Sequence, residues 1–428
     1  MSKSWLWLVG LVAVVVAIPL ALVHAGGGGW LHRQLVALHG GALHASAPHS
    51  PAPTDDVVLP FELAMGHIML PVTVNESAPL SFMLDTGDKY GIIDLDLARE
   101  LKLALGGAIQ VHGVGAAMAD GALVNDATFA IAGLTGAPQT IALAVPLSSM
   151  ASALGRRFDG IFGAEFLANF VVEIDYDARQ LVLHRRDTFD YHGSGEVLPI
   201  RIDSFGHPIV KATLTPIDKS PLQIDLMVDV GSNGSLVLNS PFVNEHHLPS
   251  PGQRTIRALG QSGAGGHSSG VEGRVASLQL GAVTLSEPAT VFSNDTGGAF
   301  AATDNQGNLG QRILERFHVI LDYARSRIIL EPLASVHDPF AATATGMRIE
   351  SGGADFTDFH VLDVLDGSPA SEAGVHIGDR ITSIDGRPAR DFTLTRLSEL
   401  FRQPTSRSIV LERDGKTVTV SLTPRPLI

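Results

Sequence analysis

Phe82-Met83-Leu84-Asp85-Thr86-Gly87 is the stretch that decides the fold, because its pattern returns as Leu226-Met227-Val228-Asp229-Val230-Gly231. In both copies three apolar residues lead into an aspartate, which is followed by a β-branched residue and a glycine. An acid at the end of a buried strand is costly unless something uses it. Two such acids in two copies of one unit predict a pair of carboxylates brought together between two lobes.

The sequence around the two aspartates repeats at matched distances. Each copy has a glycine-rich stretch after the aspartate, at residues 113–121 and 260–273. Each copy then closes on a glycine, Gly163 at 78 positions after Asp85 and Gly310 at 81 positions after Asp229. So many matched offsets predict a duplicated β-rich lobe. The glycine-rich stretches are then either flaps over a bound peptide or plain hairpin loops.

Composition favours a compact, turn-rich, mostly β protein and argues against several classes of function. The chain has 428 residues, of which 45% are hydrophobic and 17% charged, with 45 glycines and 24 prolines. The formal net charge is −14 and no long basic face is visible, so we expect no nucleic acid partner. There is no cysteine, which excludes disulfides, thiol nucleophiles and cysteine-ligated metals. We expect neither a metal nor a cofactor.

The N-terminus indicates export. Residues 5–23 are uncharged and almost wholly apolar, and Val23-His24-Ala25 offers a small-residue cleavage site. We therefore predict a signal peptide or an uncleaved signal anchor over residues 1–25. Residues 26–55, rich in glycine, histidine and small residues, are predicted to be a flexible linker. The protein would then be periplasmic, either soluble or tethered to the inner membrane through residues 5–23.

The remaining chain divides into three predicted domains. They are a first lobe at residues 56–190, a second lobe at 191–333 and a C-terminal module at 345–426. The module contains two recognisable stretches, Gly367-Ser368-Pro369-Ala370 and Ile377-Gly378-Asp379-Arg380-Ile381. A helical pattern and a final hairpin complete the module, which we expect to be a small α+β domain.

These residues resemble two known families. Residues 57–332 resemble a bacterial two-lobed aspartic protease of the pepsin and retropepsin type. In that family each lobe has an Asp-Thr/Ser-Gly loop and a later hydrophobic-hydrophobic-Gly element, which Ile161-Phe162-Gly163 matches well and Asn308-Leu309-Gly310 less well. The C-terminal module resembles a bacterial PDZ domain. The resemblance implies a mostly β fold of duplicated pepsin/retropepsin-like lobes in a bilobal unit, plus a small α+β PDZ-like domain.

The resemblance also implies an activity. Asp85 and Asp229 would be the catalytic pair of an aspartic endopeptidase, sharing one proton and activating a water molecule that attacks a peptide bond. The substrate would be a polypeptide, and a single chain that carries both lobes is expected to be a monomer. The residues expected to support the pair are Thr86, Gly87, Gly231, Ser232, Gly163 and Gly310.

Two positions depart from the family pattern. Val230 has no hydroxyl where the family has a threonine or serine that ties the two loops together. Asp88 stands where serine or alanine usually follows the glycine, and a third carboxylate near the pair would disturb its protonation. Two alternatives therefore stay open. One is a catalytically inactive peptide-binding or adaptor protein that keeps the fold, and the other is a hydrolase that acts on something other than protein.

The C-terminal module has its own predicted partner. A PDZ domain binds an extended peptide or a protein C-terminus as an added strand beside its own edge. We predict that Phe359, His360 and Val361 form this edge and that residues 352–354 lie near the carboxylate pocket. The alternative is that the module packs on the protease and binds nothing.

Overall fold

The computed structural model describes residues 56–428, except for 112, 115–117, 132–133, 135–138, 261 and 264–265. The predicted signal segment and linker, residues 1–55, lie outside the described residues. Within the part of the chain that is described, no helix is long and apolar enough to cross a membrane. The described residues all belong to one compact unit.

The first lobe is built on a nine-stranded sheet whose path is β2-β3-β4-β10-β5-β9-β7-β6, with β8 beside β3 and β9. Its apolar strands pack in one hydrophobic core with those of the second lobe. The strands are β2 (Glu62–Ala64), β3 (His67–Val74), β4 (Leu80–Leu84), β5 (Gly91–Asp94), β6 (Ala104–Val111), β7 (Ala119–Asn125), β8 (Thr128–Ala130), β9 (Gln139–Val145) and β10 (Gly160–Phe162). The helices are α2 (Leu95–Glu100), α3 (Ser148–Leu154) and α4 (Ala164–Leu167).

The second lobe has the corresponding strands and two short helices. Its strands are β14 (Pro208–Thr215), β15 (Leu222–Val228), β16 (Leu236–Leu238), β17 (Ile256–Arg257), β18 (Ser262–Gly263), β19 (Gly266–His267), β20 (Gly270–Arg274), β21 (Ser277–Leu280), β22 (Val283–Ser286), β23 (Ala289–Ser293) and β24 (Gly307–Leu309). Its helices are α5 (Ser240–Glu245), α6 (Gln311–Leu314) and the 3-10 turn η1 (Ala299–Ala301).

The strand that leads to each aspartate has the same two neighbours in both lobes. β4 runs parallel to β10, with Leu84 opposite Phe162, and β10 is antiparallel to β5 on its other side. β15 runs parallel to β24, with Val228 opposite Leu309, and β24 is antiparallel to β16. The predicted mostly β architecture of two matched lobes is thus confirmed.

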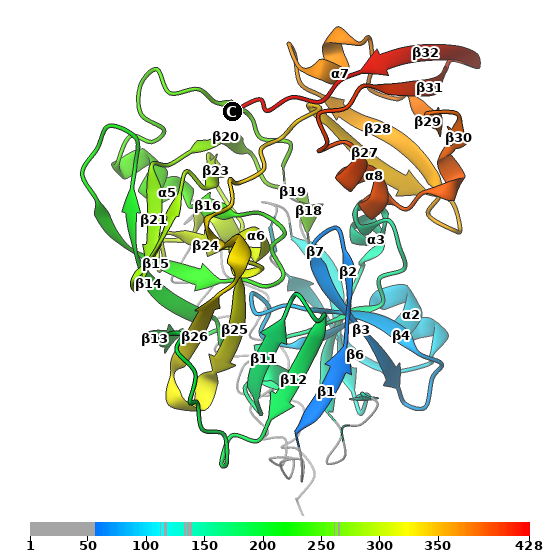
Figure 1. The fold of residues 1–428 in the computed structure, drawn as a ribbon. Coiled ribbons are helices and arrows are strands. Elements are labelled where there is room, and N and C mark those ends of the chain that lie inside the picture. Colours follow the sequence, from blue (N-terminus) through cyan, green and yellow to red (C-terminus); the bar gives the residue numbers. More distant parts are fainter. Residues whose placement is uncertain are drawn as a thin grey trace, which may run out of the picture. The chain divides into compact units, whose positions relative to one another are not determined.

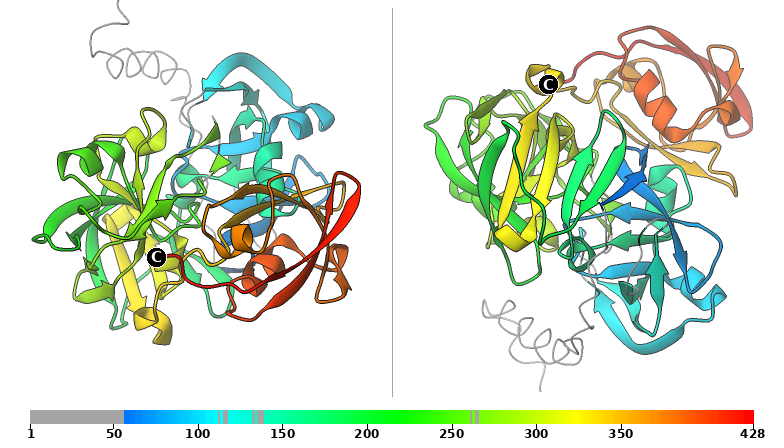
Figure 2. Two further views of the ribbon diagram at one scale, coloured as in Figure 1. Left: turned by 90° about the horizontal axis from the view of Figure 1, so that it is seen from above. Right: turned by 60° about the horizontal axis from the view of Figure 1, so that its bottom comes forward.

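Six antiparallel strands join the two lobes, in the order β1-β12-β11-β25-β26-β13, and they form one end of a 15-stranded sheet that continues through β14 into the second lobe (Figures 1 and 2). Its central contact is the pairing of β11 from the first lobe with β25 from the second, where Val172 lies opposite Leu321 and both are fully buried. The strands are β1 (Val57–Pro60), β11 (Val171–Asp175), β12 (Gln180–His184), β13 (Glu196–Ile202), β25 (Phe317–Asp322) and β26 (Arg327–Pro332). Short 3-10 helices follow at η2 (Tyr323–Arg325) and η3 (Ala334–His337).

The C-terminal module has a separate six-stranded sheet and its own apolar core. The Ser-Pro turn starts a helix because the Ser368 hydroxyl caps the Ser371 N–H and Pro369 occupies the first turn. The strands are β27 (Met347–Gly352), β28 (Asp358–Val364), β29 (Arg380–Ile384), β30 (Arg387–Pro388), β31 (Arg407–Arg413) and β32 (Lys416–Leu422). The helices are α7 (Pro369–Glu372), α8 (Leu394–Leu400) and η4 (Ala389–Asp391).

A charged cluster crosses the seam between the lobes. The Glu173 carboxylate on β11 bonds the His184 Nε2 at 2.7 Å within its own lobe and the His318 Nε2 of β25 at 2.9 Å. The two histidine contacts hold the pKa of Glu173 at about 2, although burial opposes this shift. The pKa values of both imidazoles are raised, for His184 by Glu173 and Asp56 against the opposing effect of burial, and for His318 chiefly by Glu173. The cluster therefore stabilises the seam when Glu173 is ionised and the imidazoles are charged.

We predict that Glu173→Gln lowers the free energy of unfolding by about 1–3 kcal/mol at pH 5.5 and by less at pH 9. The histidine contribution is fully present below the unfolded pKa of 6.5 and is lost as the pH rises through the raised folded values. The glutamate contribution is present above pH 4.5, the unfolded pKa, and is lost as the pH falls towards the folded pKa of about 2. Urea denaturation at the two pH values measures the difference. Asp96→Asn, at an exposed surface pair, is the control, and an equal loss at both pH values for Glu173→Gln would contradict the prediction.

Candidate active site

The two predicted aspartates end their strands at the junction of the lobes. The backbone N–H of Asp85 is bonded to Phe162 and that of Asp229 to Leu309, each at 3.0 Å. After each aspartate the chain turns back, so that the Gly87 N–H donates to Asp85 Oδ1 at 2.7 Å and the Gly231 N–H donates to Asp229 Oδ1 at 2.9 Å. The two carboxyl groups are hydrogen-bonded to each other.

Both glycines of the loops are required by the close approach of the carboxyl groups. A Cβ on Gly87 would lie 3.1 Å from Oδ1 of Asp85 and 3.1 Å from Oδ1 of Asp229. A Cβ on Gly231 would overlap the Asp85 carboxyl group. The two acids thus face each other across a space that admits no side chain from either loop.

Thr86 ties the two loops together. Its buried hydroxyl accepts the Val230 N–H at 3.0 Å and donates to the Val228 carbonyl at 2.6 Å. Val230 occupies the corresponding place in the second lobe and is fully buried. It has no hydroxyl, so it cannot make the equivalent hydrogen bonds to the loop of the first lobe. The link between the loops therefore depends on one side chain instead of two.

Gly163 and Gly310 pack directly against the backbone that follows each aspartate loop. A Cβ on Gly163 would lie 2.5 Å from the Tyr90 carbonyl oxygen, and one on Gly310 would lie 2.5 Å from the Gly234 carbonyl oxygen. The residue after Gly163 donates its N–H to the Asp88 carbonyl, and the residue after Gly310 donates to the Ser232 carbonyl, both at 2.7 Å. Asp88 and Ser232 therefore occupy equivalent positions in the two loops.

Asn308 is a site residue that the sequence reasoning missed. Its side-chain amide donates to Asp229 Oδ2 at 2.7 Å, and the residue is buried. In the first lobe the same strand position is held by Ile161, which pairs with Met83 as Asn308 pairs with Met227. The sequence does show Asn308 as a polar residue where the hydrophobic-hydrophobic-Gly element of the family has an apolar one. Without the structure, this difference indicated only a weaker match to the family.

The environment of the two acids opposes their ionisation. Burial raises the pKa of Asp85, and Gly87, Asp229 and His207 oppose the rise. Burial, the charge of Asp85 and that of Asp88 raise the pKa of Asp229 well above its usual range. The pair thus keeps a proton to higher pH than two isolated aspartates would.

Asp88 belongs to the same electrostatic group. Burial and the charge of Asp85 raise the pKa of Asp88 to about 7, and His207 lowers it. The sequence left open whether this side chain faces solvent. It is half-buried beside the pair, so its charge bears on the pair's protonation. In the described part of the chain, no group of three or more histidine or acidic side chains is arranged to hold a metal ion.

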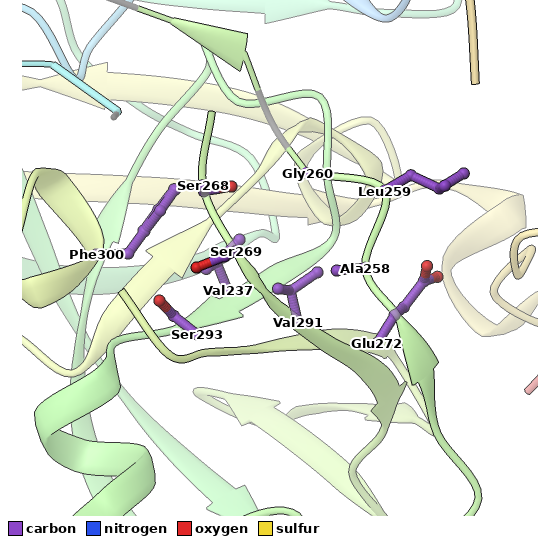
Figure 3. A pocket seen from close by; sticks show the side chains of 10 residues that line it. All are labelled: Val237, Ala258, Leu259, Gly260, Ser268, Ser269, Glu272, Val291, Ser293 and Phe300. Carbon is purple, nitrogen blue, oxygen red and sulfur yellow. The ribbon is translucent and has the colours of Figure 1, made fainter. Parts of the chain in front are cut away.

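A separate cavity of about 140 Å³ lies in the second lobe, beneath the glycine-rich stretch at 260–273 (Figure 3). Its walls are mainly apolar and serine side chains, and Glu272 is its only titratable lining residue. Glu272 is bonded to Thr343 at 2.8 Å. None of the lining residues belongs to the aspartate loops, so this cavity is distinct from the carboxyl pair.

The structure corrects the predicted peptide-binding edge of the C-terminal module. Phe359, His360 and Val361 lie on β28, which pairs with β27 on one side and with β29 on the other. Phe359 and Val361 are buried in the core. The prediction was wrong because an apolar alternating strand reads the same at the centre and at the edge of a sheet. The edge strand on this side is β27, next to α8.

We predict that Thr86→Val lowers the free energy of unfolding by about 2–4 kcal/mol, because it leaves the Val228 carbonyl and the Val230 N–H buried without a partner. The midpoint and slope of urea denaturation measure the loss. Thr86→Ser is the matched control, since it keeps the hydroxyl and should lose about 1 kcal/mol or less. Equal losses for the two variants would show that the hydroxyl does not tie the loops.

Comparison with known proteins finds the same two modules. A family model described as aspartyl protease matches residues 70–166, and one described as PDZ domain matches residues 360–412. Basic 7S globulin from soybean is similar at 12% identity and a TM-score of 0.39, over 67% of this chain and 98% of that one. Conglutin gamma from lupine seeds is similar at 12% identity and a TM-score of 0.39, over 66% of this chain and 96% of that one. The HtrA3 PDZ domain bound to a phage-derived ligand is similar at 21% identity and a TM-score of 0.17, over 19% of this chain and 82% of that one. The family models thus identify an aspartyl protease domain followed by a C-terminal PDZ domain.

Proposed function

We propose that the protein is an exported aspartic endopeptidase that hydrolyses peptide bonds with a water molecule activated by Asp85 and Asp229. The observation that carries this proposal is the hydrogen-bonded carboxyl pair between two tight glycine loops. Two carboxyl groups that are hydrogen-bonded to each other share a proton, and that is the state an acid–base pair needs for hydrolysis of an amide.

The chemistry follows from the unequal environments of the two acids. Ionised Asp85 takes a proton from the water as its oxygen attacks the peptide carbonyl carbon, while protonated Asp229 donates a hydrogen bond to the carbonyl oxygen. Asp85 then gives the proton that it took from the water to the leaving nitrogen, the C–N bond breaks as the carbonyl re-forms, and the pair returns to its starting state. The Asn308 amide and the Gly231 N–H hold the Asp229 carboxyl in place throughout.

A catalytically inactive peptide-binding protein is the second candidate. Two observations favour it: the missing hydroxyl at Val230 and the third carboxyl at Asp88. The first weakens the link between the loops, and the second adds negative charge beside the pair. Neither removes the pair itself.

We further propose that the PDZ domain regulates access to the pair by binding the C-terminus of a polypeptide. Helix α3 of the first lobe contacts the edge strand β27, where an added peptide strand would pair. The Ser351 hydroxyl of β27 donates to the Ser152 carbonyl at 3.0 Å, and the Thr395 hydroxyl of α8 accepts the Met65 N–H at 3.0 Å. A Cβ on Gly155, at the end of α3, would overlap Leu394 of α8.

The same edge also touches the second lobe. Arg348 of β27 lies 3.4 Å from the His267 ring on β19, and α3 contacts β18. The hairpin of β18 and β19 lies within the glycine-rich stretch that the sequence offered as a flap. A peptide that displaces α3 from β27 would therefore free contacts to this hairpin.

We predict that the full-length protein cleaves unfolded protein between pH 3 and 7 and that Asp85→Asn and Asp229→Asn each lower kcat by at least about 1000-fold. Fragment mass spectrometry and initial rates measure the loss. Asp295→Asn is the control, because Asp295-Thr296-Gly297 carries the same three residue types in a loop after β23 and should keep activity. If the parent cleaves nothing at any pH but binds peptide, the inactive candidate is correct.

We predict that removing the two polar contacts between the PDZ edge and the first lobe strengthens peptide binding. The double variant Ser351→Ala/Thr395→Val should bind a C-terminal peptide about 5- to 30-fold more tightly, because the peptide no longer competes with two hydrogen bonds. Isothermal titration calorimetry of the full-length protein measures this. Ser406→Ala, which removes an exposed PDZ hydroxyl pair away from β27, is the control. Unchanged affinity in the double variant would argue against competition with α3.

A further inference from the structure

A glycine-histidine pair precedes the first long strand of each lobe. The pairs are Gly66-His67 and Gly206-His207, and both glycines have positive φ, at 91° and 87°. The strands that follow have the same register against the aspartate strands, since Met69 pairs with Met83 and Ile209 with Met227. The two histidines therefore occupy equivalent positions, each at the start of the strand that flanks its lobe's aspartate strand.

Each glycine-histidine turn reaches the opposite lobe. A Cβ on Gly66 would lie 3.5 Å from Cβ of Asn233 in the second lobe. A Cβ on Gly206 would lie 3.3 Å from Cβ of Ala164 and 3.9 Å from Cγ of Lys89 in the first lobe. The His67 ring interacts with the backbone of Gly231, and the His207 ring acts on the charges of Asp85 and Asp88. Each histidine thus lies beside the aspartate loop of the other lobe.

The two imidazoles have different surroundings, which shift their pKa values in opposite directions. Nδ1 of His67 is buried and has no partner among the described residues, and burial lowers the pKa of this ring to about 4. His207 Nδ1 instead lies 2.9 Å from Asp203 Oδ2. The acidic groups around His207 raise its pKa against the opposing effect of burial. Burial therefore disfavours the charged form of His67, whereas the neighbouring carboxyl groups favour the charged form of His207.

Asp203 holds His207 in place. Its carboxylate accepts the backbone N–H of Phe205 at 2.8 Å and that of His207 at 2.9 Å, and the Phe205 ring stacks on the imidazole. The groups that face this imidazole are the carboxyls of Asp203, Asp88 and Asp85, with the Lys89 stem against the turn. The buried hydroxyl of Tyr323 has no hydrogen-bond partner among the described residues. Burial and the charges of Asp85 and Asp203 raise its pKa.

We propose that His207, oriented by Asp203, is a positioning residue of the carboxyl pair whose imidazolium compensates the third carboxylate, Asp88. This inference rests on the proposed endopeptidase function. Three carboxyl groups without a cation would retain extra protons, and the pair could not then reach its singly ionised state at the usual pH. The cation from the second lobe restores that state, so His207 offsets the departure at Asp88.

The test is the pH profile of kcat/KM for the full-length protein. His207→Asn removes the cation, so every carboxyl keeps its proton to higher pH and both limbs of the profile move up by about 0.5–1 pH unit. Asp88→Ser removes the third carboxylate and moves both limbs down. The double variant returns towards the parent, because the two changes cancel. His67→Asn is the matched control at the equivalent position, since this imidazole is neutral above its pKa of about 4 and its removal should leave the basic limb in place.

A loss of kcat/KM by the same factor at every pH in His207→Asn would reduce His207 to a structural role and overturn the proposal. A readout that needs no activity separates this failure from failure of the proposed function. In the NMR titration of the His207 ring, Asp88→Ser should lower the midpoint by at least about 0.3 pH unit. An unmoved midpoint overturns the proposal even in an active enzyme, whereas a parent that cleaves nothing overturns the proposed function alone.

Discussion

The contact of two buried carboxyl groups between the lobes is the constraint on which the rest of the structure depends. It requires glycine at position 231, where a Cβ would overlap the Asp85 carboxyl group, and it leaves little room for a Cβ at position 87. It requires a fixed distance between the loops, which Thr86 sets through two hydrogen bonds. It also requires that the lobes stay in register, and the pairing of β11 with β25 provides this.

The two lobes have matching backbones around the carboxyl pair, but they contribute different side chains to its surroundings. The first supplies the hydroxyl that links the loops and the extra carboxyl of Asp88. The second supplies the Asn308 amide to the acid and the charged imidazole of His207. Each of these four departs from its counterpart in the other lobe, and all four act on the same pair. The two acids therefore have unequal surroundings, because each change places a donor or a charge on one side only.

The PDZ domain is part of the same contact system. Its edge strand and its helix α8 meet a helix and a turn of the first lobe, so the surface that would receive a peptide is already in contact with the protease domain. The alternative considered for the sequence, that the module packs on the protease, is thus compatible with peptide binding. A ligand would have to compete with these contacts, and its affinity would depend on their free energy.

The sequence by itself determined the duplicated lobes, the two aspartates and the C-terminal module, because apolar runs into Asp-x-Gly at matched offsets and the Gly-Ser-Pro-Ala turn are local patterns. It also contained the Asn308 and Gly-His signals, but nothing local gave them a meaning. Only the tertiary structure decided that Asn308 reaches Asp229, that each histidine lies beside the opposite lobe's loop, and that β28 is interior. The physical reason is that hydrogen bonds, charge and strand neighbours depend on which distant residues pack together, and a linear pattern does not specify that.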